Sequence, residues 1–194
     1  DPVRLLTLFV TADRHDLDLH PEAYSGVMRS LGLVTPKLRR DPRATAAFLN
    51  VLAHGQRPYR VLTIMNETGL LGRFLPEWGR IVGQTQFNMY HAYTVDEHTI
   101  RAIGLLADIE QDRLKDDHPL STALFRQIGS RRTLYIAVLL HHISAAPDSR
   151  HVHLQVVGNA RPIEVIPGNP ATTERAQGIS QGILDGAIKR GHPL

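Results

Sequence analysis

The chain has 194 residues, of which 42% are hydrophobic and 21% charged, with a formal net charge of +3 and no cysteine. This length can bury a sizeable core, and the lack of cysteine excludes disulfides and thiolate zinc sites and suits a reducing cytoplasm. The pI is about 9.5, but no Lys/Arg run with interleaved aromatic residues indicates a nucleic-acid surface, and no apolar run is long enough to cross a membrane.

The first quarter of the chain predicts three helices. Apolar residues recur at helical spacing over residues 2–11, and residues 21–31 begin a second helix with proline in its first turn. Asp41 and Pro42 form an N-cap and N1 pair for the third. Its predicted core-facing residues are Phe48, Leu49 and Leu52.

The next helix is predicted around residues 61–65, whose apolar side chains would line the core. Gly69 can end this helix in the left-handed conformation. Pro76, Gly79 and Gly83 then interrupt the chain before the following helix. Between them, Trp78 is expected to be a core residue rather than a binding platform.

A helix that carries His98 is predicted next, because apolar residues recur around it every three or four positions. His98 falls on this apolar stripe. Thr94 and Glu97 have the spacing of a capping box, in which Thr94 caps the helix and Glu97 reaches back from the third position. This would place His98 near the positive end of the helix, where anions are favoured. The apolar positions of the stripe are Val95, Ala102, Leu105, Leu106 and Ile109.

A polar connector over residues 112–117 and a short helix over 121–128 are predicted before a second histidine-bearing helix. Residues 134–140 are apolar almost all round, which indicates a buried helix, and His141 continues its apolar row. Two imidazoles on separate core helices can meet around a metal ion, but they can equally be core histidines hydrogen-bonded to backbone carbonyls. Their spacing leaves both readings open.

The character of the sequence changes at residue 147. Residues 151–157 alternate and are rich in β-branched side chains, so they predict a strand, and residues 162–166 predict another. A helix through residues 183–188 would follow. We therefore expect a mainly α fold with a short α/β C-terminal tail, divided into a helical domain over residues 1–146 and a divergent tail over residues 147–194.

The segment 87–99, FNMYHAYTVDEHT, closely resembles the start of the HD domain in the bifunctional uridylyltransferase/uridylyl-removing enzymes. The resemblance extends upstream through residues 65–76 and downstream through residues 134–141, and covers about residues 1–143. It implies an HD-domain-like helical bundle in the cytoplasm. Because the chain begins at Asp1 without Met, we also expect it to be an internal fragment that lacks the nucleotidyltransferase and glutamine-sensing domains of that family.

The resemblance implies a metal-dependent hydrolase that removes UMP from a tyrosine of the PII nitrogen-signalling protein. The family uses Mg or Mn, and His98 and His141 would be its core ligands in this chain. A divalent ion lowers the pKa of a bound water and neutralises charge on phosphoryl oxygens. The implied partners are therefore PII and UMP or a related nucleotide, with no nucleic acid and no membrane.

The chain departs from the family pattern after His141. His142 stands where the family has the metal-bridging aspartate, and Ala145 stands where it has a lysine. Further on, Arg150 replaces an aspartate and His151 matches the family histidine, while the helices that would carry the last metal-binding aspartate are not found. His142 and His151 would be substitute ligands. Imidazole favours Zn or Ni over Mg or Mn, so we expect at most a mononuclear, weakly active site.

Asp96 and Glu97 are the candidate catalytic carboxylates, because they neighbour His98 and could orient a ligand or accept a proton. Acidic residues in a first helical turn are equally explained as complements of the helix dipole. An alternative function fits the same sequence: a catalytically inactive helical domain that binds proteins or a nucleotide.

Overall fold

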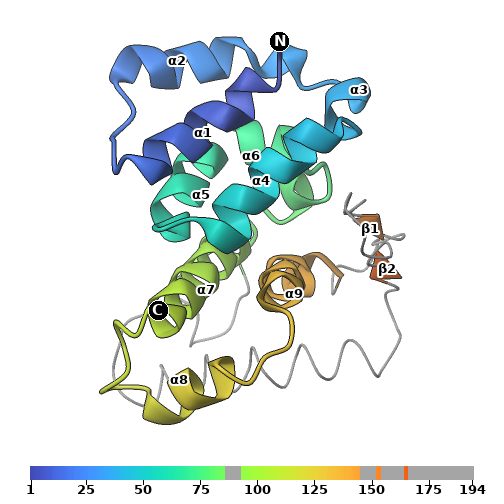
Figure 1. The fold of residues 1–194 in the computed structure, drawn as a ribbon. Coiled ribbons are helices and arrows are strands. Elements are labelled where there is room, and N and C mark those ends of the chain that lie inside the picture. The colour runs from blue at the N-terminus through green and yellow to red at the C-terminus, as the bar shows by residue number, and fades with distance from the viewer. Residues whose placement is uncertain (86–92, 145–151, 154–163, 166–194) are drawn as a thin grey trace.

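The fold is mainly α in a computed structural model that describes residues 1–85, 93–144, 152–153 and 164–165 (Figure 1). Helices α1 to α6 form one part of the molecule in Figure 1, and α7 to α9 lie beside them. One continuous apolar core joins the two parts, because buried side chains of α1, α4, α5, α7 and α9 belong to the same cluster. Among the described helices, none is long and apolar enough to cross a membrane.

Helices α2, α4 and α5 each begin at a proline, whereas α1 begins at Arg4. Helix α1 (Arg4–Arg14) is followed by α2 (Pro21–Arg29), and α4 (Pro42–His54) by α5 (Pro58–Glu67). The Asp41 carboxylate accepts a hydrogen bond from the Arg43 N–H at 2.8 Å, which confirms the predicted N-cap of α4. The short helices η1 (Leu31–Leu33) and α3 (Pro36–Arg39) between α2 and α4 were not predicted.

Helix α5 ends as predicted at Gly69, which has a φ of +76°. Glycine adopts this left-handed conformation readily because it has no Cβ, and the Gly69 N–H donates to the Asn66 carbonyl at 2.9 Å. The chain then forms α6 (Leu70–Phe74) and η2 (Trp78–Arg80), which the sequence analysis treated only as an interruption. Trp78 is completely buried, which confirms its predicted place in the core.

The C-terminal half consists of α7 (Val95–Glu110), α8 (Pro119–Phe125) and α9 (Arg131–Ser144). Helix α7 packs against α5 on one side and α9 on the other. Helix α8 starts and ends earlier than the predicted 121–128, because Pro119 supplies a helix start that the prediction overlooked.

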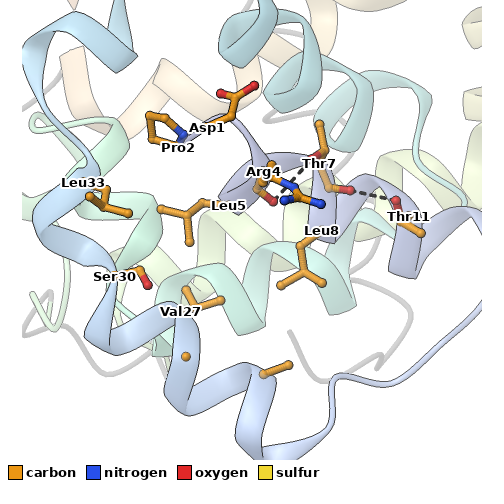
Figure 2. A pocket seen from close by; sticks show the side chains of 12 residues that line it. Asp1, Pro2, Arg4, Leu5, Thr7, Leu8, Thr11, Val27, Ser30 and Leu33 are labelled. Carbon is orange, nitrogen blue, oxygen red and sulfur yellow. Dashed lines mark hydrogen bonds between the residues drawn. The ribbon is translucent and has the colours of Figure 1, made fainter.

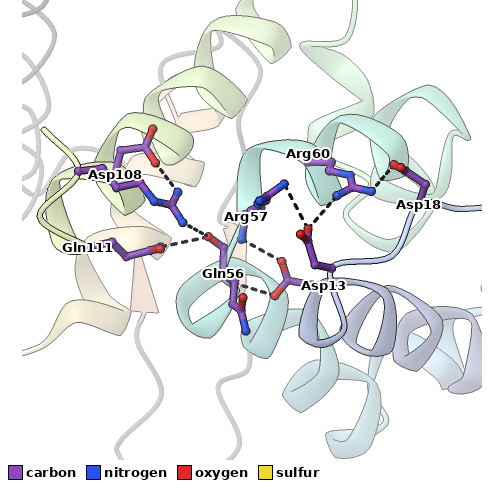
Figure 3. A network of polar contacts seen from close by, with 9 residues as sticks. Asp13, Asp18, Gln56, Arg57, Arg60, Asp108 and Gln111 are labelled. Carbon is purple, nitrogen blue, oxygen red and sulfur yellow. Dashed lines mark hydrogen bonds and ion pairs between the residues drawn. The ribbon is translucent and has the colours of Figure 1, made fainter.

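A single turn between α4 and α5 connects three helices (Figure 3). The Asp13 carboxylate of α1 accepts the Gln56 N–H at 2.8 Å and the Arg57 N–H at 2.9 Å. The Gln56 carbonyl accepts hydrogen bonds from Gln111 at 3.1 Å and Arg113 at 3.5 Å, beyond the C-terminus of α7. The backbone of this turn is thus held from both sides by side chains distant in sequence.

In the tail, β1 (Val152–His153) and β2 (Glu164–Val165) pair in antiparallel orientation, with Val152 opposite Val165. Both lie inside the predicted strands 151–157 and 162–166, which are otherwise outside the described residues. The predicted helix over 183–188 also lies outside them.

Helices α5 and α7 approach closely at Gly104. A Cβ added there would lie 2.7 Å from the Tyr59 Cβ, closer than two carbon atoms can pack. We expect Gly104→Ala to lower the free energy of unfolding by about 1–2 kcal/mol, because the overpacking cost outweighs the better helix propensity of alanine. Urea denaturation followed by circular dichroism measures this change.

The matched control is Gly26→Ala in α2, where an added Cβ meets no atom within 4 Å. This substitution should stabilise the protein by about 0.5–1 kcal/mol. An equal gain at both glycines would show that α5 and α7 do not pack as closely as described.

Candidate functional site

His98 lies in the first turn of α7, as predicted. The helix begins at Val95, and the His98 N–H donates to the Thr94 carbonyl at 2.9 Å. The side chain of His98 is half-buried, although it falls on the apolar stripe of the helix. His98 therefore lies at the edge of the core, at the positive end of a helix.

The predicted capping box at this helix start is wrong. Thr94 occupies the N-cap position with the extended backbone that a cap requires, but its side chain accepts no capping hydrogen bond. Its hydroxyl bonds to the Asp96 carboxylate instead. Glu97 does not reach back; it is exposed and pairs with Arg101, one turn onward, at 3.4 Å.

The Asp96 carboxylate is buried at the contact between α5, α7 and the turn after η2 that contains Gly83. It accepts hydrogen bonds from Asn66 Nδ2 at 2.7 Å and from the Gly83 N–H at 3.0 Å. Asn66 Oδ1 in turn accepts the indole N–H of Trp78 at 2.8 Å. Burial by itself would raise the pKa of Asp96, but the hydrogen bonds from Thr94, Asn66 and Gly83 outweigh it and hold the pKa below its ordinary value.

Asp96 and His98 point in different directions from α7. Two residues apart on an ideal helix, their side chains diverge by about 160° around the helix axis. The hydrogen bonds of Asp96 account for its burial and fix the start of the helix that carries His98. A catalytic role for Asp96 or for the exposed Glu97 stays a prediction.

His141 lies near the C-terminus of α9 and is half-buried. Burial lowers its pKa, so the neutral imidazole predominates at neutral pH. Neutral imidazole is the form that ligates metals. The position continues the buried row of Leu134 and Val138, as the sequence predicted.

Hydrogen bonds connect α7 and α9 at the end of the helix pair that is away from the two histidines. Glu110, in the last turn of α7, accepts hydrogen bonds from Arg131 at 2.9 Å and from the Tyr135 hydroxyl at 2.7 Å. Burial of Tyr135 and the Glu110 carboxylate raise the pKa of that hydroxyl, so it remains a donor. With a rise of 1.5 Å per residue, His98 lies about 18 Å before Glu110, and His141 about 9 Å beyond Tyr135. Both histidines thus lie away from the hydrogen bonds of Glu110.

The remaining predicted ligands do not complete a site within the described residues. His142 belongs to α9, which extends through Ser144, but its side chain is outside the described part, and so is all of His151. In the part of the chain that the structure describes, no group of three or more His, Asp or Glu side chains is arranged to hold a metal ion. A metal shared by His98 and His141 stays a prediction.

Arg101 is a feature of this region that the sequence analysis missed. Its guanidinium carbon lies 4.0 Å from the ring centre of Tyr93 and 5.8 Å from that of Tyr59. The signal was present in the spacing, since Arg101 follows Glu97 by four residues and His98 by three. Tyr93 belongs to the segment 87–99, and its observed contact is this stacking against Arg101.

A surface groove of about 540 Å³ lies elsewhere, between α1 and α2 (Figure 2). Leu5 and Leu8 of α1 face Val27 of α2 across it. Neither His98 nor His141 lines this groove. It is therefore separate from the candidate site.

Comparison with known proteins supports the resemblance to the bifunctional uridylyltransferase/uridylyl-removing enzymes, but does not test the assignment to their HD domain. Residues 1–74 match the family described as "Uridylyltransferase GlnD third domain". The chain is 57% identical over 141 residues to the bifunctional uridylyltransferase/uridylyl-removing enzyme of Caulobacter vibrioides. The aligned region covers 73% of this chain and 15% of that protein. The enzyme of the same name from Phenylobacterium zucineum is 55% identical over 141 residues, which again make up 73% of this chain and 15% of that protein.

The enzyme of this name from Novosphingobium aromaticivorans is 51% identical over 151 residues, or 78% of this chain and 17% of that protein. The chain thus spans about a sixth of the length of the relatives it matches. No solved structure matches it.

The buried Asp96 network generates a prediction about stability. Asp96→Asn keeps the shape but replaces one acceptor oxygen by a donor, which would face the donors of Asn66 or Gly83. We expect a loss of about 1–3 kcal/mol in the free energy of unfolding at pH 7.

The pH dependence of this loss follows from the lowered pKa. The stabilisation by ionised Asp96 is fully present above the ordinary value of 3.8 and disappears as the pH falls through the lower folded pKa. Denaturation curves of both proteins should therefore converge only at acid pH. A difference that is constant with pH would contradict a stabilising charge at this position.

Proposed function

We propose that this chain is a metal-dependent phosphodiester hydrolase domain of the uridylyl-removing type, with the PII signalling protein as its substrate. The observation that carries this proposal is the 57% identity to a bifunctional uridylyltransferase/uridylyl-removing enzyme across 141 residues. A match of this extent supports a common fold and a common location for the site. The assignment to the HD-domain half of the activity comes from the segment around His98.

The described residues supply part of what a divalent ion requires. His98 and His141 would hold it, because both are half-buried imidazoles on helices packed against each other. His142 and His151 would complete the ligand set. The bound ion would activate a water molecule and neutralise charge on the phosphoryl oxygens.

The rest of the site holds these groups in place. The Asp96 network fixes the first turn of α7 against α5, and the Glu110 contacts fix α9 against α7. Both are positioning contacts, since none of them reaches the proposed ligands. Glu97 is exposed beside His98 and would be the carboxylate that accepts or returns a proton.

The second candidate function is a catalytically inactive helical domain that binds proteins or a nucleotide. The observation that favours it is the replacement of the family's bridging aspartate by His142. The two candidates differ in metal content, which makes metal analysis the first experiment.

We expect the purified protein to retain about one divalent ion per chain and to hydrolyse bis-p-nitrophenyl phosphate slowly. His98→Ala and His141→Ala should each remove the ion and the activity, because each deletes an imidazole ligand. Elemental analysis and nitrophenol release measure the two effects. His15→Ala, an exposed histidine at the end of α1, is the matched control. A metal-free parent protein with no hydrolysis would favour the inactive domain.

His142→Asp tests whether the missing aspartate is the only defect. We expect no gain in Mn-dependent hydrolysis, because one carboxylate does not restore the lysine replaced by Ala145 or the family's final aspartate. The measurement is hydrolysis of the same substrate with and without Mn. A clear rise above the parent would show that His142 alone limits the activity.

A further inference from the structure

Arg101 lies on the same side of α7 as His98. The two residues are three positions apart, so their side chains diverge by about 60° on an ideal helix. The guanidinium lies over the ring of Tyr93 at 4.0 Å and near that of Tyr59, which belongs to α5. Tyr93 and Tyr59 thus hold the guanidinium of Arg101 beside the first turn of the helix.

The hydrogen-bonding capacity of Arg101 is only partly used. Its Nη2 pairs with Glu97 at 3.4 Å, near the limit of a hydrogen bond, and the Glu97 side chain is 46% exposed. The Nε atom is buried, and no acceptor lies within hydrogen-bond distance of it among the described residues. A buried donor without an acceptor is costly unless a ligand or water satisfies it.

We propose that Arg101 binds the phosphoryl group of a nucleotide substrate or product at this site. Arginine suits this role because its planar guanidinium donates two parallel hydrogen bonds to phosphate oxygens while its face stacks on an aromatic ring. Stacking fixes the orientation in advance, which reduces the entropy lost when the anion binds. The proposal rests on the proposed function, since it assigns a substrate-binding residue to the same site.

A purely structural role for Arg101 makes a different prediction. As a staple between Tyr59 and Tyr93, the arginine would affect stability alone and would have no effect on anion affinity. Glu97 separates the two roles further, because its carboxylate would repel a phosphate at Arg101. Removing that charge should tighten phosphate binding, whereas it would only weaken a staple.

The first experiment measures binding of inorganic phosphate, UMP and uridine by calorimetry in EDTA. We expect phosphate and UMP to bind the full chain and uridine to bind at least tenfold more weakly than UMP. Arg101→Gln should weaken phosphate and UMP about 10- to 100-fold, the range for losing a charge-assisted hydrogen bond. Arg101→Lys should recover part of the affinity, because it keeps the charge without the planar fork.

Arg113→Gln is the matched control. It removes the same charge beyond the other end of α7, where Arg113 pairs with Asp108 at 2.7 Å. Phosphate affinity should stay within twofold of the parent. Glu97→Gln should increase phosphate affinity about two- to fivefold, in line with a surface charge pair in water. Equal affinity in the parent and Arg101→Gln, or no binding by the parent, overturns the proposal.

A measurement on the parent protein itself avoids the problem of variants that misfold. In the parent protein, the arginine Nε–H signal that disappears in Arg101→Lys should shift in nuclear magnetic resonance spectra as phosphate is added. A signal that does not move while phosphate binds overturns the proposal without any need for a folded Arg101→Gln.

The outcomes distinguish this proposal from the proposed function. Arg101-dependent phosphate binding without hydrolysis supports the anion site and contradicts the hydrolase. Metal-dependent hydrolysis with unchanged KM and unchanged phosphate affinity in Arg101→Gln supports the hydrolase and contradicts the anion site.

Discussion

The arrangement of the candidate site depends on one buried charge. Ionised Asp96 is held inside the protein by donors from Asn66 and Gly83, and the energetic penalty of burying a carboxylate without such donors is large. These hydrogen bonds hold the start of α7 against the end of α5 and against the turn that contains Gly83. Trp78 extends the network into the core through Asn66. The positions of His98 and Arg101 follow from this arrangement, because both residues belong to α7.

Two further contacts fix how α7 packs against α5 and against α9. The close approach of Gly104 to Tyr59 sets how tightly α5 and α7 pack, and it also places the ring of Tyr59 near Arg101. At the C-terminal end of α7, Glu110 accepts hydrogen bonds from Arg131 and Tyr135 of α9. A helix held at one end and packed along its length has little freedom at the other. The position of His141 therefore follows from contacts well removed from it.

Local signals in the sequence predicted the features that depend on a single residue's chemistry. Asp41 with Pro42 predicted a helix start, and Gly69 predicted a helix end, because capping and left-handed backbone are local properties. The Thr94–Glu97 box failed for a non-local reason: the Thr94 hydroxyl and Glu97 each have a partner nearby in Asp96 and Arg101. Pattern reading cannot rank such competing partners.

The site itself was predictable only in part, for the same reason. Helical periodicity predicted His98 and His141 on the apolar faces of their helices, and in the structure both are half-buried at the edge of the core. The burial of Asp96 and the stacking of Arg101 depend on α5, whose register against α7 is not encoded in either helix alone. The ligand roles of His142 and His151 stay predictions, because their side chains lie outside the described residues.

The turn between α4 and α5 has a consequence for how this region tolerates change. Surface turns usually accept inserted residues with little harm. Here Gln56 and Arg57 present their backbone N–H groups to Asp13, while the Gln56 carbonyl receives Gln111 and Arg113. One extra residue would move the donors and the acceptor out of register together. We therefore expect this turn to tolerate an inserted residue as poorly as the core does, and length variation among homologous chains to avoid it.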